Sequence, residues 1–369
     1  MPVTNLKQSI IEGEPVDDEF NAGVWLFPAK KLLASDVPGA HSVSREALAA
    51  RPLTLKCTDN KGIGGSVAAC FRQVAISCTH KSQNGFVPGR QFLNNIVHTD
   101  TLARAHAIRD QSSRERPDFN YSISPDQVAS LAVSAFFDYV AAFPSVFHHW
   151  IEIVLAAIQA PVALVNTFKA MYHNVQAYMV VGGQLKHLFE VKAGVMQGCP
   201  LSALLFNFAL DPLLWLFDSL VVVPQFGKVW ACADDLAATV RSLEQLIRVA
   251  RAFDLFAKFS GLKLGQAKCC IVLNSVIANS NNIALVKAWL EQNIPSWKNF
   301  SISNHAKYLG IQMGPSAGAV QWLDSIGKFK SRVSDIAASG ESAALCFRQY
   351  SARAVPVLTF VSQLITPPQ

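Results

Sequence analysis

The sequence has few charged residues and no cysteine pair with metal-binding or redox-motif spacing. Only 16% of its 369 residues are charged and 51% are hydrophobic, which argues against long disordered regions. None of the eight cysteines has the C-x-x-C spacing, so the sequence signals neither a zinc finger nor a thioredoxin-type motif. Because no signal peptide is recognisable either, we expect reduced thiols in an intracellular protein of the nucleus or cytoplasm.

An uninterrupted hydrophobic run of membrane-spanning length is also missing. The best candidate, residues 203–223, is interrupted by Asn207, Asp211, Pro212 and Asp218. Each aspartate in mid-span would cost about 2.5–3.5 kcal/mol. We therefore expect a buried helix of a folded protein and no membrane partner, and the formal charge of +6 suits a polyanion instead.

Strand-like and helical patterns are mixed without strict alternation or internal repeats, which predicts an α+β fold. Apolar runs predict strands within residues 22–34, 131–140, 229–235, 268–274 and 307–313. Helical spacing predicts helices at 64–77, 145–175, 201–220 and 242–261, the last closed by Gly261. Residues 1–21 are polar without a clear period, and residues 109–127 are expected to form a flexible surface loop.

Two of the predicted strands end in acidic residues. One brings Asp138, and the other brings the adjacent pair Asp234 and Asp235. If the strands are neighbours, the carboxylates meet at one edge of the sheet, where they repel unless a cation such as Mg²⁺ compensates them. Two such ions support phosphoryl transfer. The alternative for the Asp-Asp pair alone is an ordinary hairpin turn.

A set of motifs in order resembles the reverse transcriptases of non-LTR (LINE-type) retrotransposons. The central ones are FFDYVAAF (136–143), AGVMQGCPLSALLFNFALDPLL (193–214) and CADD (232–235). RPLTL (51–55) and GFVPGRQFLNNI (85–96) resemble motifs before them, and SGLKLGQAKC (260–269), KYLGIQMGP (307–315) and QYSARAVPVLTFVSQL (349–364) resemble motifs after them. The resemblance covers roughly residues 22–365.

The resemblance implies the catalytic group. Asp138 and Asp234 would be the principal ligands of two Mg²⁺ ions, for which Mn²⁺ is a substitute, and the Tyr139 carbonyl would join them. Asp235 would be the supporting acid. Lys268 matches a lysine proposed to protonate the leaving pyrophosphate, with a surface lysine as the alternative.

The same resemblance implies a deoxynucleotide site. Arg51 and Lys30 or Lys31 match basic positions that hold the triphosphate, and Phe143 matches the bulky residue that excludes a ribose 2′-hydroxyl. Gln197 falls on the element that contacts the incoming base. Each assignment has an alternative. The basic residues could be solvated surface charges, Phe143 could be an ordinary core residue, and the segment around Gln197 could be a capped helix start.

Contacts to template and primer are implied as well. The residues assigned to them are Arg90, Gly198, Ser202, Tyr308, Leu309 and Gly310. For Arg90, an ordering role within its loop is equally compatible with the sequence. The pair His148 and His149 is no metal site on this interpretation, because adjacent helical residues do not share a face.

The resemblance implies a right-hand polymerase whose palm contains an antiparallel sheet. We expect an N-terminal tail over 1–21, fingers over 22–130, the palm over 131–315 and a partial thumb over 316–369. The implied function is RNA-directed DNA polymerisation with an RNA template, a DNA or RNA primer and dNTPs. A catalytically inactive retroelement remnant that at most binds nucleic acid is the alternative.

Overall fold

The computed structural model describes residues 3–30, 50–113, 118–220 and 226–368, so Lys31 lies outside the described residues. The chain begins with helices α1 (Val3–Glu12) and α2 (Asp18–Asn21). Leu6 and Ile10, one helical turn apart, pack into the main core, and α1 lies against α7 (Val162–Tyr172). The expectation of a tail over 1–21 is therefore wrong for the described residues, because this short apolar face is buried.

A four-stranded sheet joins two distant parts of the sequence. Its strand order is β2-β1-β4-β5, with β1 (Gly23–Leu26), β2 (Leu53–Lys56), β4 (Gln176–Val181) and β5 (Gln184–Glu190). Strand β1 pairs antiparallel with β2 and parallel with β4. Residues 176–190, which fall in the sequence range expected for the palm, therefore lie in the same sheet as strands expected for the fingers.

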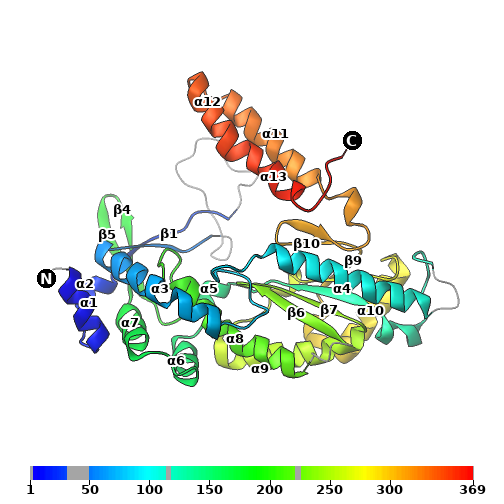
Figure 1. Cartoon of the computed structure of the whole chain (residues 1–369), viewed down its shortest axis with the longest axis horizontal. Coiled ribbons are helices and arrows are strands. Elements are labelled where there is room, and N and C mark those ends of the chain that lie inside the picture. The colour runs from blue at the N-terminus through cyan, green and yellow to red at the C-terminus, as the bar shows by residue number, and fades with distance from the viewer. Residues whose placement is uncertain (1–2, 31–49, 114–117, 221–225, 369) are drawn as a thin grey trace.

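A five-stranded sheet forms the centre of the molecule. Its order is β6-β7-β3-β8-β9, with β3 (Val133–Phe137), β6 (Gly227–Cys232), β7 (Asp235–Val240), β8 (Cys270–Leu273) and β9 (Ser301–Ser303). In Figure 1, α4 (Leu93–Ser112) covers one face, and α8 (Ser202–Leu220) and α9 (Leu246–Ser260) cover the other. Every residue of β3 is buried because both faces are covered.

Neighbouring side chains of β3 pack on opposite faces of the central sheet. Phe136 packs toward Ile96 of α4 and toward Tyr308, whereas the ring of Phe137 lies 4.7 Å from that of Phe253 in α9. This alternation follows from the period of two in a strand. The mixture of helices and mainly antiparallel sheet confirms the predicted α+β class.

Further helices complete this part of the fold. The chain also contains α3 (Thr58–Cys78), α5 (Ala142–Ser145), α6 (His148–Ala157) and α10 (Ser280–Asn293). Helix α4 continues to Ser112, so the predicted surface loop begins later than expected. The last turn of α4 is held by a tertiary contact, because the Gln111 side chain donates a hydrogen bond to the Ser275 carbonyl at 3.1 Å.

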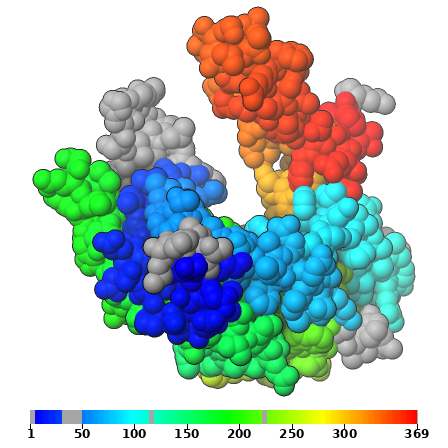
Figure 2. All heavy atoms as spheres, turned by 60° about the vertical axis from the view of Figure 1, so that its left-hand side comes forward, coloured from blue at the N-terminus to red at the C-terminus, as the bar shows by residue number. Residues whose placement is uncertain are grey.

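A helical arm follows the sheet. The segment predicted as one strand is a hairpin of β10 (Ala306–Tyr308) and β11 (Ile311–Met313), after which α11 (Leu323–Ala337), α12 (Ala343–Gln349) and α13 (Val355–Ser362) form the arm. Figure 2 shows a hollow between this orange and red arm and the N-terminal and β4–β5 elements. At the base of the arm, the Phe360 and Phe92 rings stack with centroids 5.9 Å apart.

Helix α8 is long and apolar enough to cross a membrane by length and composition. In the structure, 56% of its apolar window is buried inside the protein. Its two aspartates, Asp211 and Asp218, bond to His80. This burial is what the sequence predicted for a core helix.

We predict that Gly261→Ala destabilises the fold. Gly261 ends α9 with a φ of +80°, and an added Cβ would lie 2.4 Å from the Ser145 carbonyl oxygen. Left-handed strain and overlap should together lower the free energy of unfolding by roughly 2–3 kcal/mol, measured by urea denaturation with circular dichroism.

Gly327→Ala is the matched control. Gly327 is an exposed residue inside α11, and a Cβ there meets no atom within 4 Å. Helix propensity should raise stability by roughly 0.5–1 kcal/mol. Equal effects at the two glycines would contradict the packing described for the end of α9.

Candidate active site

The structure brings the three predicted acids to one edge of the central sheet. Strands β3 and β7 pair antiparallel with Phe137 opposite Leu236, so the next residues, Asp138 and Asp235, lie side by side. Strands β6 and β7 form a hairpin closed by Cys232 and Asp235. Asp234 is therefore in the two-residue turn, next to the other two carboxylates.

Electrostatics show that these carboxylates interact. Burial raises the pKa of Asp234, and the charge of Asp138 raises it further. Partial removal from water, followed by the charges of Asp234 and Asp138, raises the pKa of Asp235 to about 6. The repulsion expected from the sequence is thus present, and a cation bound here would relieve it.

Lys268 already supplies one positive charge. Its ammonium lies 3.2 Å from Oδ1 of Asp138, and both side chains are about half exposed. Behind them, the Cys269 thiol touches the main chain of Asp138, and burial raises the pKa of this thiol to about 11. Cys269 therefore acts as a neutral packing residue.

Tyr139 can serve the site only through its main chain. Its ring is buried against Phe253. The backbone on both sides is tied to one segment, because Val140 N–H donates to the Lys263 carbonyl and Gly265 N–H donates to the Asp138 carbonyl. The predicted role of the Tyr139 carbonyl as a metal ligand stays a prediction.

The carboxylates at this edge fit a hard divalent cation whose remaining ligands are water molecules and substrate phosphates. Among the described residues, no group of three or more His, Cys, Asp and Glu side chains is close enough to hold a metal ion. Mg²⁺ often binds through only one or two carboxylates, keeping waters and substrate phosphates as its other ligands. The coupled carboxylates of Asp138 and Asp234 supply that oxygen chemistry.

The loop before α8 packs against the segment that follows Asp138. Gly194 and Val195 donate their N–H groups to the carbonyls of Val146 and Phe143, each at 2.7 Å. Gly194 has a φ of +90°, and a Cβ would lie 2.5 Å from the Pro144 carbonyl oxygen. The half-buried ring of Phe143 stacks on Phe206 at 4.5 Å. Phe143 is therefore fixed between this loop and α8.

The same loop also contacts β2. The Thr54 N–H donates to the Gln197 carbonyl at 3.0 Å, and the exposed Gly198 leaves no room for a Cβ beside the Thr54 carbonyl. Arg51, exposed just before β2, follows the bridge between Ala29 and Ala50, and Lys30 adjoins the same bridge. The structure thus places Lys30, Arg51 and Gln197 near one end of the sheet that contains β1 and β2.

Two residues predicted to contact template or primer have buried side chains. The Ser202 hydroxyl donates to the Met196 carbonyl at 2.7 Å and also contacts the Tyr172 hydroxyl, so it holds the loop from within. Tyr308 packs on Phe136 in the core. Direct side-chain contact with nucleic acid is contradicted for both residues by this burial.

The turn after Tyr308 remains accessible. Leu309 and Gly310 link β10 to β11 with φ values of +48° and +86°. Gly310 is exposed, and Leu309 is half-buried. Of the three residues predicted here, these two have surface that faces out of the core, and their primer contact stays a prediction.

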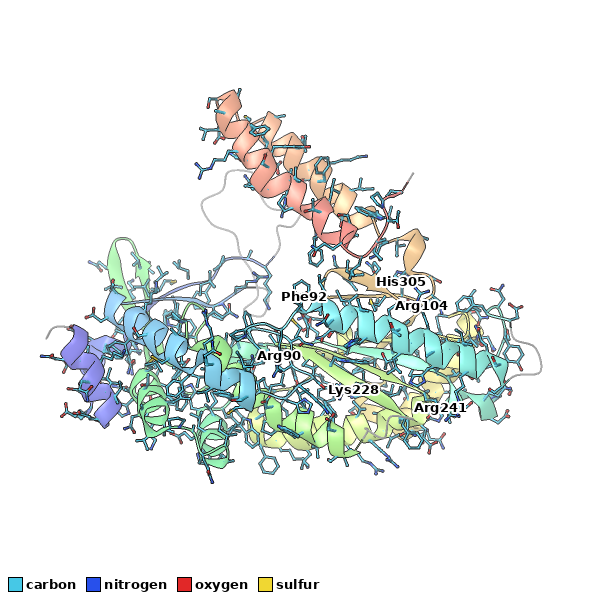
Figure 3. All side chains as sticks on the ribbon, in the orientation of Figure 1. Arg90, Phe92, Arg104, Lys228, Arg241 and His305 are labelled. Atoms are coloured by element: carbon cyan, nitrogen blue, oxygen red, sulfur yellow. The ribbon has the colours of Figure 1, made fainter. Side chains whose placement is uncertain are left out.

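The Arg90 side chain forms hydrogen bonds with the protein's own backbone. It lies in the loop between α3 and α4 (Figure 3). Its two terminal nitrogens donate to four carbonyls at 2.6–2.9 Å, those of Ile76, Thr79, His80 and Gln83. These bonds assign Arg90 the ordering role that the sequence left open, and its template contact stays a prediction.

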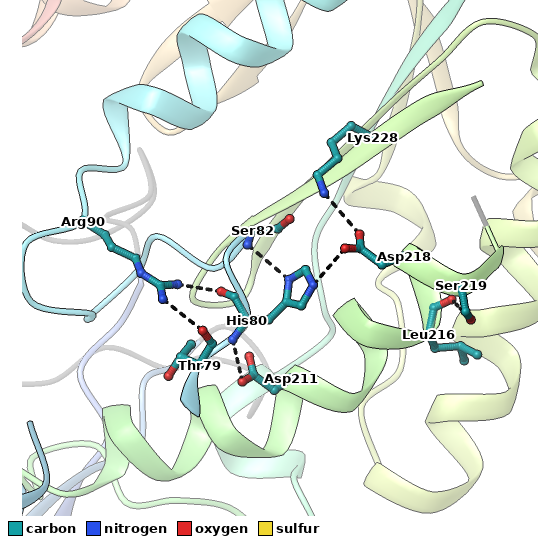
Figure 4. Close-up of polar contacts among 9 residues, drawn as sticks. All are labelled: Thr79, His80, Ser82, Arg90, Asp211, Leu216, Asp218, Ser219 and Lys228. Atoms are coloured by element: carbon teal, nitrogen blue, oxygen red, sulfur yellow. Dashed lines mark hydrogen bonds and ion pairs between the residues drawn. The ribbon is translucent and has the colours of Figure 1, made fainter. Parts of the chain in front are cut away.

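His80 anchors the same loop to α8, as Figure 4 shows. The His80 ring lies 3.1 Å from the Asp218 carboxylate and accepts from Ser82 N–H at 3.1 Å, while the His80 N–H donates to Asp211 at 2.8 Å. Lys228 of β6 also pairs with Asp218 at 3.2 Å. Sequence reasoning missed this network; the one available signal was the pair of acids inside an apolar helix.

The two histidines weighed as a metal pair point to different partners. His148 lies 2.8 Å from the Gly194 carbonyl, and the exposed His149 pairs with Glu152 at 3.5 Å. This geometry agrees with the expectation that adjacent helical residues face apart.

Comparison with known proteins points to one family. Residues 47–313 match the model of the family described as reverse transcriptase (RNA-dependent DNA polymerase). The chain is 26% identical over 224 residues to the transposon TX1 uncharacterized 149 kDa protein of Xenopus laevis. That match covers 59% of this chain and 16% of the relative, so the chain spans a small part of its curated relative's length.

Solved structures show a similar fold. Apo telomerase of Candida tropicalis, truncated from its C-terminal domain, matches with a TM-score of 0.53 and 11% identity over 84% of this chain and 57% of that one. Telomerase of the same organism in complex with a fragment of telomeric RNA matches with a TM-score of 0.53 and 10% identity, over 98% and 56% of the two chains. These likenesses confirm the predicted right-hand polymerase fold.

Asp211 provides a pH prediction. Burial raises its pKa to about 7, whereas the unfolded carboxyl titrates near 3.8. The folded protein therefore holds an extra proton between these values, so the stability due to neutral Asp211 is present below about pH 4 and is lost as pH rises through 7. Relative to Asp211→Asn, the wild type should lose on the order of 4 kcal/mol across this range in urea denaturation.

Asp254→Asn is the control for this measurement. Asp254 is exposed on α9, so its substitution removes a carboxyl without altering the buried network. Its stability difference from wild type should stay small throughout. A difference for Asp211→Asn that is constant from pH 4 to 8 would contradict a buried, protonated Asp211.

Proposed function

Because the chain belongs to the reverse transcriptase (RNA-dependent DNA polymerase) family, we propose that it extends a primer 3′-hydroxyl with deoxynucleotides along an RNA template. The family match and the transposon relative confirm the predicted resemblance to reverse transcriptases of non-LTR retrotransposons. The observation that carries the proposal is the meeting of Asp138, Asp234 and Asp235 at one sheet edge.

Reverse transcriptase domains generally use divalent metal ions. In this proposal, Asp138, Asp234 and the Tyr139 carbonyl hold two Mg²⁺ ions, or Mn²⁺ in their place. When bound, the ions activate the attacking hydroxyl and offset the charge of the leaving pyrophosphate. Asp235 supports the pair electrostatically, in line with its coupling to both other acids.

The chain's own residues orient the nucleotide. Arg51 and Lys30, grouped at one bridge, bind the triphosphate, and the ring of Phe143 lies under the sugar. The ammonium of Lys268, beside Asp138, donates a proton to the leaving pyrophosphate. Gln197 borders the incoming base through the loop fixed on β2.

The hollow seen in Figure 2 is our proposed place for template and primer. The accessible turn Leu309–Gly310 would face the primer, and Gly198 would allow the template to approach the backbone. We also propose an intracellular location, in the nucleus or cytoplasm, which the eight free cysteines support.

We predict that Asp234→Asn abolishes primer extension. The substitution removes one charge from the metal-binding edge, so extension of a DNA primer on an RNA template with Mg²⁺ should fall at least about 10³-fold. Asp254→Asn, the same change on an exposed part of α9, should extend the primer at the wild-type rate.

The inactive-remnant alternative has a distinct outcome in this assay. A folded wild-type protein that binds primer–template but adds no nucleotide with either Mg²⁺ or Mn²⁺ would overturn the polymerase proposal. Equal residual extension by the wild type and Asp234→Asn would do the same, because the acids would then have no catalytic role.

Phe143→Val should relax sugar selection. Removing the ring opens the space that a ribose 2′-hydroxyl would occupy, so the ratio of kcat/KM for dNTP over rNTP should fall by roughly tenfold or more. Phe259→Val, which shortens an exposed ring on α9, should leave the ratio unchanged. An unchanged ratio in folded Phe143→Val would assign this ring to packing alone.

A further inference from the structure

The turn that carries Asp234 has a strained backbone. Ala233 has a φ of +54°, a left-handed conformation that non-glycine residues rarely adopt and that costs on the order of 1–3 kcal/mol. It follows Cys232 directly and precedes Asp234, so its conformation sets the direction in which the Asp234 side chain leaves the hairpin. Surrounding contacts must hold such a turn in place.

One buried side chain bonds both backbone groups of Ala233. The Gln83 carbonyl oxygen Oε1 accepts from Ala233 N–H at 2.7 Å, and Nε2 of Gln83 donates to the Ala233 carbonyl at 3.2 Å. The same Oε1 accepts from Gly85 N–H at 2.8 Å. Gln83 is fully buried, so these bonds are not shared with solvent.

The backbone of the Gln83 loop is pressed against the turn as well. A Cβ on Gly85 would lie 2.2 Å from the Ala233 nitrogen, so only glycine allows this approach. Asn207 of α8 donates to the Gly85 carbonyl at 2.7 Å from the other side. Ser82 and Asn84 exchange backbone hydrogen bonds with Ala231, which joins the loop to the end of β6.

The loop is itself rigidly held. Arg90 binds its carbonyls, and His80 fixes its start to the two acids of α8 (Figure 4). Because the loop is held by these other contacts, the position of the Gln83 amide does not depend on the turn. The amide therefore fixes the conformation of the strained turn.

Building on the function proposed above, we propose that Gln83 is the positioning residue of the acidic hairpin. By bonding Ala233 at both backbone groups, it holds Asp234 in the orientation that lets its carboxylate share a divalent cation with Asp138. Gln83 acts through the turn and not by touching substrate. Groups that orient metal ligands in this way typically contribute 10–100-fold to metal affinity or activity.

The test compares Mn²⁺ binding by Gln83→Met and wild type. Methionine keeps the length and burial of the side chain but lacks the amide. Mn²⁺ alone is titrated into each full-length protein, and the free ion is measured by electron paramagnetic resonance. We expect the dissociation constant to rise at least about tenfold, while binding of primer–template at low salt without metal stays within about twofold.

Gln91→Met is the matched control. Gln91 is exposed in the same loop, and the contacts of the turn do not involve its side chain. Its Mn²⁺ affinity should equal that of wild type. Gly85→Ala tests the same proposal without removing a hydrogen-bonding group, because its Cβ displaces Ala233, and its affinity should also fall.

A double-mutant cycle separates positioning from a loss of stability. If Gln83 acts through Asp234, Gln83→Met should weaken Mn²⁺ binding far less in an Asp234→Asn background than in wild type. A merely structural role would lower the melting temperature and leave Mn²⁺ affinity unchanged, or give equal losses in both backgrounds. Either result overturns the proposal. If Gln83→Met does not fold, Gly85→Ala decides instead: a folded Gly85→Ala protein that binds Mn²⁺ with wild-type affinity also overturns it.

Failure of this inference and failure of the proposed function give different results. If Asp138→Asn and Asp234→Asn weaken Mn²⁺ binding but Gln83→Met does not, only the positioning role is wrong. If neither aspartate variant alters Mn²⁺ binding, the metal site itself is wrong.

Discussion

Mutual repulsion among three carboxylates at one edge of a sheet is the constraint on which the rest of this structure depends. In an unfolded chain Asp138 would lie apart from Asp234 and Asp235, but antiparallel pairing of β3 with β7 holds all three together. The core on both faces of β3 stabilises that pairing. Burial of apolar side chains thus stabilises a sheet edge at which carboxylates repel one another. The ammonium of Lys268, and any cation bound there, reduces this repulsion.

The acidic hairpin depends on a segment that the sequence separates from it by about 150 residues. The loop between α3 and α4 bonds Ala233, joins β6 and is fixed by His80 and Arg90. Arg90 illustrates why a motif position need not contact a ligand: a guanidinium has five donors in a fixed fork and can order several carbonyls at once. A motif assigned to the fingers therefore supports the palm.

Much of the fold follows from sequence pattern. Strand β3, helices α8 and α9, and the end of α9 at Gly261 lie close to where apolar periodicity and a terminal glycine predict them. Predictions failed where tertiary contact decided the outcome: α1 is ordered by packing of Ile10, and α4 is extended by contacts near Ser275. Polar composition alone cannot report such contacts.

For the site, the sequence by itself determined which residue types stand after the strands and in what order. It also determined the family, because the eight motifs quoted above are specific when they occur together in this order. Only the tertiary structure decided which of those side chains face outward: Ser202 and Tyr308 bond within the protein, whereas Asp138 is half exposed. It also revealed Gln83, since a hydrogen bond between residues 150 positions apart has no local signature and exists only once the sheet and the loop have packed together.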